Sequence, residues 1–338
     1  QRAYYANIKT QEIHCITKIQ GTHVVKIGQN GKYFIDSYSS VTVPKEYNIL
    51  DLQGRIVKNI LIAKDPLTEY NMPKARIFTI KAADNKEDLY VRMITPPNMD
   101  KSKKYPVIVY VYGGPHAQLI TNSWLGGAQM WLYYMAQKGY ICFTVDNRGS
   151  YNRGLAFENV IHRNLGQNEM KDQMEGIKYL KTLPYVDTNR IGVFGWSFGG
   201  FMTTSLMLNY PETFKVGVAG GPVIDWKYYE IMYGERYMDM PEENVDGYKK
   251  TSLLDKEKIK RLKGRKILLI QGAVDKTVVW QHSLRFIQEC VKANVPVDFF
   301  VYPLAEHNVR GYDRIHLMDK ITTYFDDYLK NYYKQNGK

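Results

Sequence analysis

The chain has 338 residues, 44% of them hydrophobic and 24% charged, which is enough for a globular protein with a large buried core. The formal net charge is +12, yet the basic residues are interspersed with acidic ones, which argues against binding to nucleic acid. Three widely spaced cysteines argue against a disulfide framework or a zinc site, and we expect no metal and no other cofactor. No apolar run approaches the length of a membrane span.

The first part of the chain, residues 1–65, reads as a β-meander. Short strand-like runs occupy residues 4–8, 13–16, 23–27 and 33–36. Asn30-Gly31 is a hairpin signal, and residues 52–55 form a second candidate turn. Strands at this spacing are typical of propeller blades, but they are too few for a propeller, and a small sheet packed on the main domain is the alternative. Because the chain opens with Gln1 inside an apparent strand, we expect a fragment of a longer protein.

From residue 75 onward a hairpin is followed by alternating strands and helices. The hairpin strands are expected at residues 75–80 and 89–94, and later strands at 106–112, 140–145, 191–194, 215–219, 266–271 and 297–302. Helices are expected at residues 128–137, 168–183, 201–208, 280–292 and 313–328. This alternation predicts an α/β fold with a mostly parallel sheet, in which ligands bind at the carboxyl ends of the strands.

The sequence Gly-Trp-Ser-Phe-Gly-Gly at residues 195–200 lies between a predicted strand and a predicted helix. In that context a G-x-S-x-G match predicts a nucleophile elbow, which presents the hydroxyl of Ser197 above the sheet. Gly195 and Gly199 leave space where larger side chains would collide with neighbouring backbone. The alternative is a glycine-rich turn with a surface serine.

A serine nucleophile needs a base and a group that orients the base, and on this fold the chain order is Ser, then Asp or Glu, then His. Asp275 follows the strand expected at residues 266–271, and His307 follows the last strand. The sequence therefore predicts a triad of Ser197, Asp275 and His307. Asp298 and Glu306 compete with Asp275 for its role.

The negative charge that develops on an attacked carbonyl oxygen needs hydrogen-bond donors. The loop Tyr-Val-Tyr-Gly-Gly-Pro at residues 110–115 could supply one through the hydroxyl of Tyr112. Its two glycines would let the backbone approach the site. The alternative is that Tyr112 is a core aromatic at the end of a strand.

An aromatic segment at residues 220–237 follows the strand after the elbow and should overhang the site. Flat aromatic walls suit a compact apolar ring such as that of proline. Without further information, an aromatic cluster of this kind would more often belong to the core.

Six spaced motifs together resemble the prolyl oligopeptidase clan, and most closely its dipeptidyl peptidase IV branch. They lie at residues 112–115, 146–150, 195–200, 226–237, 272–275 and 306–307. Within that branch, residues 220–226, 229–237, 278–283 and 306–309 are especially similar to the bacterial prolyl tripeptidyl aminopeptidases. The resemblance extends over residues 75–330.

The resemblance implies an α/β-hydrolase domain at residues 66–338, preceded at residues 1–65 by the last strands of a β-propeller and the return linker. The rest of the propeller would lie outside this chain. The resemblance also implies roles for single residues. Tyr112 and the amide of Phe198 would form the oxyanion hole, and the proline pocket would be lined by Phe198, Val223, Trp226, Tyr229, Tyr233 and Val278.

The chain departs from the dipeptidyl pattern at Phe198, where the branch usually has tyrosine, and at Thr277, where it usually has asparagine. Glu230 matches the position at which the tripeptidyl enzymes hold the free amine of the substrate. A carboxylate facing an ammonium group would enforce exopeptidase action and set the peptide length by distance. The alternative is Glu230 on a solvated helix face.

These features predict a serine exopeptidase that acts through an acyl-enzyme and releases a tripeptide or dipeptide by cleavage after proline. The expected binding partners are peptides with a free N-terminus. By analogy with the family, we also expect homodimers and a periplasmic or secreted location. An acylaminoacyl peptidase or esterase is the alternative within the fold, and it would be indifferent to blocking of the substrate amine. A catalytically silent binding protein is the alternative outside it, and Ser197 would then not react with a fluorophosphonate.

Overall fold

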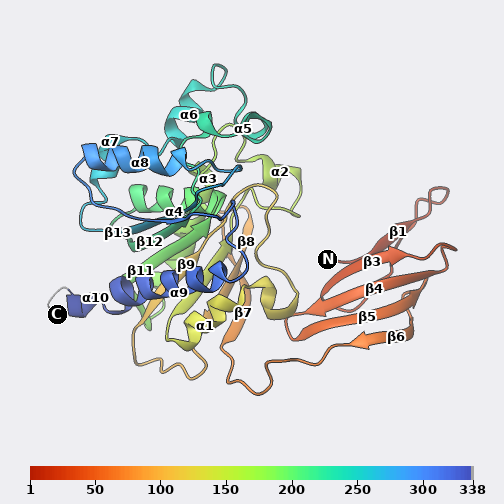
Figure 1. The fold of residues 1–338 in the computed structure, drawn as a ribbon. Coiled ribbons are helices and arrows are strands. Elements are labelled where there is room, and N and C mark those ends of the chain that lie inside the picture. Colours follow the sequence, from red (N-terminus) through yellow and green to blue (C-terminus); the bar gives the residue numbers. More distant parts are fainter. Residues whose placement is uncertain (336–338) are drawn as a thin grey trace.

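A computed structural model describes residues 1–335, and it contains one large sheet with helices on both faces, preceded by two small antiparallel sheets (Figure 1). The strands before the large sheet are β1 (Tyr4–Ala6), β2 (Ile13–Cys15), β3 (Thr22–Ile27), β4 (Tyr33–Ser40), β5 (Val43–Asp51) and β6 (Ile56–Ile62). The large sheet consists of β7 (Lys74–Lys81), β8 (Asp88–Thr95), β9 (Tyr105–Tyr110), β10 (Ile141–Asp146), β11 (Val186–Trp196), β12 (Phe214–Gly220), β13 (Lys266–Gly272) and β14 (Asp298–Tyr302).

The helices follow the strands in the alternation expected from the sequence. They are α1 (Met130–Gln137), α2 (Leu155–Asn159), α3 (Gln167–Lys181), α4 (Phe198–Asn209), α5 (Ile231–Met238), α6 (Val245–Thr251), α7 (Lys256–Lys260), α8 (Gln281–Lys292), α9 (Asp313–Phe325) and α10 (Tyr332–Gln335). Three further helical segments are η1 (Trp124–Gly127), η2 (Trp226–Tyr228) and the π-helical η3 (Asp326–Lys330). Helices α2, α6, α7 and α10 were not predicted, because segments of four to seven residues are too short to show a helical period. Helix α5 was not predicted either, and it begins within the aromatic segment at residues 220–237.

The large sheet has the order β14-β13-β12-β11-β9-β10-β8-β7. Strands β9 to β14 pair in parallel, whereas β7 and β8 form the predicted antiparallel hairpin. The prediction of an α/β fold with a mostly parallel sheet is therefore confirmed. The loops after β9, β11, β13 and β14 emerge at the same edge of the sheet, and they carry the four segments expected to form the site.

Alternation along the buried strands divides the core between the two faces of the sheet. On β9, Val107 and Val109 pack with α3, α4 and α8, whereas Ile108 and Tyr110 pack with α1 and α9 on the opposite face. All four side chains are buried, as expected for a strand covered on both sides (Figure 1). The carboxyl end of β9 thus stands between two apolar layers.

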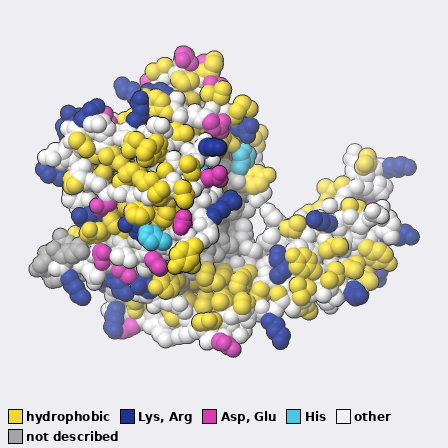
Figure 2. All heavy atoms as spheres, in the orientation of Figure 1, with side chains coloured by type: hydrophobic (Ala, Val, Ile, Leu, Met, Phe, Trp, Pro, Cys, Tyr) yellow, Lys and Arg dark blue, Asp and Glu magenta, His cyan; other side chains and the backbone are white. Residues whose placement is uncertain are grey.

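The N-terminal residues form the pair β1–β2 and a four-stranded sheet of order β3-β4-β5-β6. The candidate turn at residues 52–55 joins β5 to β6, two strands that were not predicted individually. Many apolar side chains of this sheet are exposed, among them Ile27, Ile35, Val57, Ile60 and Leu61 (Figure 2). The assignment of residues 1–65 to a propeller, with a boundary near residue 65, stays a prediction. Residues 336–338, the end of the expected hydrolase domain, lie outside the described residues.

The four-stranded sheet meets the catalytic part at the loop that precedes α1. The hydroxyl of Thr22 donates to the carbonyl oxygen of Asn122 at 3.0 Å, and the backbone N–H of Trp124 donates to the hydroxyl of Ser39 at 2.9 Å. The backbone of Leu125 adds a bond to Val41. This loop is therefore the polar contact between the two sheets.

The same loop is held on its other side by a buried arginine and a buried aspartate. Arg92 donates to the carbonyl oxygens of Leu119 and Gly126 at 2.6 and 2.7 Å. Asp146 accepts from the N–H groups of Leu119 and Ile120 at 3.0 and 2.9 Å. Burial raises the pKa of Asp146 to about 6, while these N–H groups and Arg92 oppose the shift.

Within residues 1–335, no helix has both the length and the apolar character needed to cross a membrane.

The contact of β11 with neighbouring backbone gives a test of stability. A Cβ atom on Gly195 would lie 2.3 Å from the carbonyl oxygen of Gly199 and 2.4 Å from that of Val111. Because backbone cannot move aside as a side chain can, Gly195→Ala should lower the free energy of unfolding by about 1–3 kcal/mol or more.

Urea denaturation measures this effect, with Gly234→Ala as the control. Gly234 lies in α5, and a Cβ atom there would meet only the carbonyl oxygen of Trp226 at an ordinary 3.6 Å. Alanine favours a helix, so the control should be neutral or stabilising. Equal stability of the two variants would contradict the packing argument.

Candidate active site

The elbow places Ser197 between β11 and α4 in a backbone conformation that most residues avoid, with φ 61° and ψ −119°. The N–H of Ser197 donates to the carbonyl oxygen of Gly220 at 2.7 Å, which fixes the turn against β12. A Cβ atom on Gly199 would lie 2.3 Å from the carbonyl oxygen of Val111. The glycine positions of the motif are therefore required by close backbone contacts.

The loops after β13 and β14 bring Asp275 and His307 together. Nδ1 of His307 lies 2.7 Å from Oδ2 of Asp275, which also accepts from the amide of Gln271 at 3.0 Å. Oδ1 of Asp275 accepts from the N–H groups of Thr277 and Val278, both at 2.9 Å. The carboxylate is 5% exposed and is held by four hydrogen bonds, so its orientation toward the imidazole is fixed.

Two contacts from the elbow side hold His307 in place. The indole N–H of Trp196 donates to the carbonyl oxygen of His307 at 2.8 Å. Gly221, with φ +46°, lets the backbone pass so close that a Cβ atom would lie 3.3 Å from the imidazole ring. The contact with Asp275 favours the tautomer in which Nδ1 carries the proton and Nε2 is the acceptor.

The competing carboxylates lie elsewhere. Asp298 accepts a hydrogen bond from the hydroxyl of Tyr324 at 2.7 Å, and Glu306 is exposed. Of the three carboxylates considered from the sequence, Asp275 is the one hydrogen-bonded to the imidazole of His307.

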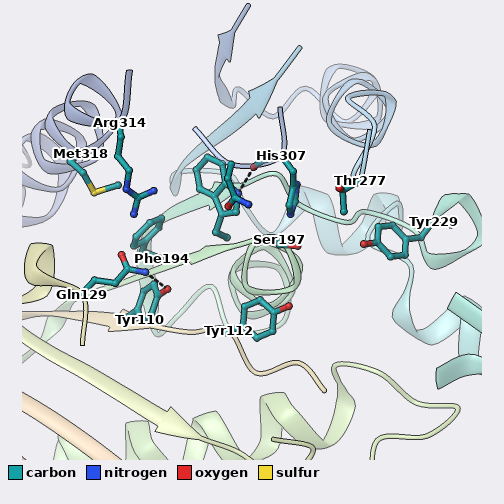
Figure 3. A pocket seen from close by; sticks show the side chains of 12 residues that line it. Tyr110, Tyr112, Gln129, Phe194, Ser197, Tyr229, Thr277, His307, Arg314 and Met318 are labelled. Carbon is teal, nitrogen blue, oxygen red and sulfur yellow. Dashed lines mark hydrogen bonds between the residues drawn. The ribbon is translucent and has the colours of Figure 1, made fainter. Parts of the chain in front are cut away.

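Ser197 and His307 line one cavity of about 450 Å³ at the edge of the sheet (Figure 3). Its walls come from the loops after β9, β11, β13 and β14, from the segment after β12, and from the starts of α1 and α9. The full lining is Tyr110, Tyr112, Gln129, Phe194, Trp196, Ser197, Tyr229, Thr277, His307, Asn308, Arg314 and Met318.

The two expected oxyanion donors come from the loop after β9 and from the first turn of α4. Tyr112 lines the cavity, and burial raises the pKa of its phenol, so the hydroxyl keeps the proton that it would donate. Phe198 is the first residue of α4, a position whose N–H has no acceptor within its own helix. The ring of Phe198 packs beside Tyr112 and against Gly114, where a Cβ atom would lie 2.6 Å from it.

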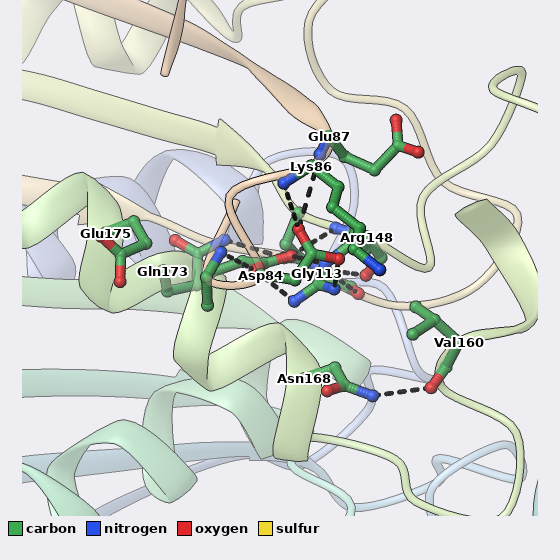
Figure 4. Close-up of polar contacts among 12 residues, drawn as sticks. Asp84, Lys86, Glu87, Gly113, Arg148, Val160, Asn168, Gln173 and Glu175 are labelled. Carbon is green, nitrogen blue, oxygen red and sulfur yellow. Dashed lines mark hydrogen bonds and ion pairs between the residues drawn. The ribbon is translucent and has the colours of Figure 1, made fainter. Parts of the chain in front are cut away.

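A polar network that sequence reasoning did not identify supports the Tyr112 loop (Figure 4). The amide of Asn147 donates to the carbonyl oxygen of Gly113 at 2.9 Å, and Gln173 donates to the amide oxygen of Asn147 at 2.8 Å. Arg148 binds both carboxylate oxygens of Asp172 on α3 at 2.8 and 2.9 Å. The motif at residues 146–150 contains Asn147 and Arg148 and so could have pointed to this network. No local sequence pattern, however, links these two residues to Asp172 and Gln173 on α3.

The expected proline pocket is closed in this conformation. Phe198, Val223, Trp226 and Val278 are each at most 2% exposed and belong to the core, and Tyr233 stacks on Trp226 with ring centroids 5.7 Å apart. Of the six residues expected to line the pocket, Tyr229 is the one that reaches the cavity. The ring of Tyr229 lies edge-on to Trp226 with the centroids 5.4 Å apart, so Tyr229 connects the cavity to the buried aromatic cluster.

Glu230 directly precedes α5, with extended backbone, and its side chain is exposed. Its negative charge acts on its neighbour Tyr229, whose pKa burial raises to about 12 with a further contribution from Glu230. The carboxylate is thus adjacent in sequence to the aromatic residue that reaches the cavity.

A buried carboxyl that was not predicted lies behind the aromatic cluster. Oε1 of Glu169 accepts from the N–H of Gly166 at 2.8 Å, and its other oxygen is buried without a hydrogen-bond partner in the described part of the chain. Burial raises the pKa of Glu169 to about 8, and the nearby charge of Asp172 adds to the shift. Charged groups are seldom fully buried, so at neutral pH this carboxyl keeps its proton.

The fold and the order of Ser197, Asp275 and His307 define an α/β-hydrolase. The model of the prolyl oligopeptidase family matches residues 128–332. Human dipeptidyl peptidase 8 is 31% identical over 310 residues, covering 88% of this chain and 34% of its own length.

Two crystal structures are also similar to the chain. A Bacteroides ovatus protein assigned as a dipeptidyl aminopeptidase IV gives a TM-score of 0.92 at 52% identity, covering 96% of this chain and 46% of its own. Porphyromonas gingivalis dipeptidyl peptidase 4 gives a TM-score of 0.89 at 31% identity with the same coverage. The chain belongs to the prolyl oligopeptidase family, in its dipeptidyl peptidase IV branch. It spans about a third of the length of the curated relatives and about half that of the solved ones.

The buried Glu169 predicts a dependence of stability on pH. The native state holds the proton of Glu169 up to about pH 8, whereas the unfolded chain releases it near the ordinary value of 4.5. The native state therefore binds more protons in this window, and its free energy of unfolding should fall as pH rises. Glu169→Gln, which keeps the shape without titrating, should remove this part of the slope.

Urea denaturation at pH 5, 6, 7 and 8 measures the slope. Glu175→Gln, on the same helix but paired with Lys178 at 2.6 Å, is the matched control and should keep the wild-type slope. If Glu169→Gln keeps that slope as well, Glu169 does not titrate as described.

Proposed function

We propose that this chain is the catalytic portion of a serine exopeptidase that removes a short N-terminal peptide by cleavage after proline. The observation that carries the proposal is the 2.7 Å hydrogen bond between Asp275 and His307, beside Ser197 in one cavity. Membership in the dipeptidyl peptidase IV branch supports a peptide substrate with a free amine.

In the proposed reaction, Nε2 of His307 takes the proton of Ser197 as the hydroxyl oxygen attacks the carbonyl carbon of proline. Asp275 holds the imidazole in the required tautomer and stabilises the imidazolium. The negative charge on the carbonyl oxygen is bound by the hydroxyl of Tyr112 and the N–H of Phe198, two donors already fixed before the reaction.

Collapse of the tetrahedral intermediate breaks the C–N bond. His307 gives its proton to the leaving amine, and the peptide that ends in proline stays as an ester on Ser197. A water molecule then transfers a proton to His307 and attacks the ester carbonyl. This second attack releases the short peptide and restores the hydroxyl of Ser197.

The aromatic cluster would hold the proline ring. Phe198, Val223, Trp226, Tyr233 and Val278 offer an apolar wall, and we infer that Tyr229 turns aside to admit the ring. Such a pocket selects by shape and apolar contact, since proline has no side-chain polar group to pair. Phe198 in place of tyrosine keeps this wall apolar.

Glu230 would bind the ammonium group of the substrate and so limit cleavage to a fixed number of residues from the N-terminus. Its similarity to the tripeptidyl enzymes favours release of a tripeptide over a dipeptide. Its exposure is consistent with a group that meets the substrate rather than the core. Thr277 lines the cavity where the branch usually has asparagine, so we do not assign it the carbonyl contact of that residue.

We further propose that residues 1–65 end a β-propeller whose other blades cover the exposed apolar side chains of the four-stranded sheet. Homodimers and a periplasmic or secreted location are proposed by analogy with the branch. Both concern the longer protein.

Mass spectrometry of products tests the proposal, with the full-length protein and free-amine peptides that carry proline second or third. We expect the fragment that ends in proline to be released, with the tripeptide favoured. Ser197→Ala should reduce turnover to background while the fold is retained. Cleavage by the alanine variant would refute the elbow assignment.

Glu230→Gln tests the amine anchor. Loss of the charge should lower kcat/KM for free-amine peptides roughly 10- to 100-fold, because a charge-assisted hydrogen bond is lost, and should affect a small ester much less. Glu242→Gln removes one exposed carboxylate elsewhere and serves as the control. Equal effects of Glu230→Gln on peptide and ester would contradict the anchor.

A further inference from the structure

The cavity around Ser197 has a second lobe that the proposed function does not use. In Figure 3, Tyr229 and Thr277 lie on one side of Ser197 and His307, whereas Gln129, Arg314 and Met318 lie on the other. We refer to the space beside these last three residues as the leaving-side lobe.

The division into two lobes follows from the two cores. Tyr112 and Tyr229 pack on the face of the sheet that α3, α4 and α8 cover. Tyr110, Phe194 and Met318 belong to the core on the opposite face, with α1 and α9. Ser197 stands where the two faces meet, so the two lobes receive opposite ends of a peptide bound across it.

This inference rests on the proposed function, which assigns the aromatic lobe to proline. A peptide chain continues through the attacked carbonyl to the leaving nitrogen on the far side of the nucleophile. The residues after the scissile bond must then lie in the leaving-side lobe, which Gln129 and Arg314 line with polar side chains (Figure 3).

The leaving-side lobe is positively charged. Arg314 is the second residue of α9 and is exposed, and within residues 1–335 no ion pair or side-chain hydrogen bond engages its guanidinium group. None of the residues that line the cavity is an aspartate or a glutamate. The charge of Arg314 acts on Tyr110: burial raises the pKa of that phenol, and Arg92 and, to a lesser degree, Arg314 oppose the rise.

The second polar group is already oriented. The amide nitrogen of Gln129 donates to the hydroxyl of Tyr110 at 2.8 Å, so its amide oxygen is turned away as an acceptor. An acceptor and a guanidinium group that line the same lobe suit a backbone N–H followed by a carboxylate. Guanidinium groups pair with carboxylates through two parallel hydrogen bonds, which gives both attraction and orientation.

We propose that Arg314 is a specificity-determining residue that selects leaving peptides with a carboxylate close to the scissile bond. That carboxylate has two sources: an acidic side chain in the first two residues after proline, or the C-terminus of a two-residue leaving peptide. Both present the same group to the guanidinium, and the experiment distinguishes them.

The test compares kcat/KM of the full-length protein for peptides that differ only in the second residue after proline, which is Glu, Gln or Lys. The wild-type protein should prefer Glu over Gln by roughly 5- to 10-fold, and Arg314→Gln should abolish this ratio. Arg314→Glu should reverse the preference in favour of Lys. Because Arg314 is exposed, the wild-type ratio should also shrink at high salt.

A second pair of peptides ends two residues after proline, with either a free or an amidated C-terminus. A preference for the free acid that Arg314→Gln removes identifies the C-terminus as a source, and a preference confined to the Glu peptide identifies the side chain. Arg310 is an exposed arginine in the loop that precedes α9 and does not line the cavity, so Arg310→Gln is the matched control and should keep the wild-type ratios.

The proposal is overturned if the wild-type protein shows neither preference, if Arg314→Gln keeps them, or if Arg310→Gln removes them equally. Hydrolysis of a prolyl anilide by the wild-type protein tests the proposed function separately, since an anilide has no peptide after the scissile bond. Failure with the anilide would refute the proposed function, whereas success with it and no preference among peptides would refute the role of Arg314.

Discussion

The structure around the site depends on one backbone contact, between the carbonyl oxygen of Val111 and the two glycines of the elbow. A Cβ atom at either Gly195 or Gly199 would lie within 2.4 Å of that oxygen. Strand β9, strand β11 and helix α4 can meet only because both side chains are absent. The tight turn that results leaves Ser197 at φ 61° and directs its hydroxyl out of the sheet.

The same packing positions the base, which lies more than a hundred residues away along the chain. Gly220 leaves room for the indole ring of Trp196, and that indole donates to the carbonyl oxygen of His307 at 2.8 Å. Ser197 and His307 are thus held through one tryptophan.

Sequence patterns could predict Ser197, Asp275 and His307, because their order and their places after successive strands are properties of the chain. No pattern relates Trp196 to His307, because that contact exists only after β11 and β14 have taken their places in the sheet.

The aromatic residues illustrate a second limit of sequence reasoning. The composition of residues 220–237 could predict an apolar wall near Ser197. Whether these side chains line the cavity or are buried in the core depends on their packing, which the spacing of residues along the sequence does not determine. Trp226 and Val223 are buried in the same core against which Tyr229 packs, so the cluster is at once a part of the core and the proposed pocket. Similarly, β5 was missed because Pro44 and the charged residues after it weaken the strand signal, and pairing with β4 and β6 overrides that local preference.

The loop before α1 has a mechanical consequence. Residues 119–126 are bonded to the four-stranded sheet on one side and to Arg92 and Asp146 on the other, and they lead directly to Gln129 in the leaving-side lobe. Ser197, Asp275 and His307 follow three other strands, β11, β13 and β14. A displacement of the N-terminal sheet would therefore reach the loop before α1 directly through these hydrogen bonds, and would reach Ser197, Asp275 and His307 only through the strands of the large sheet.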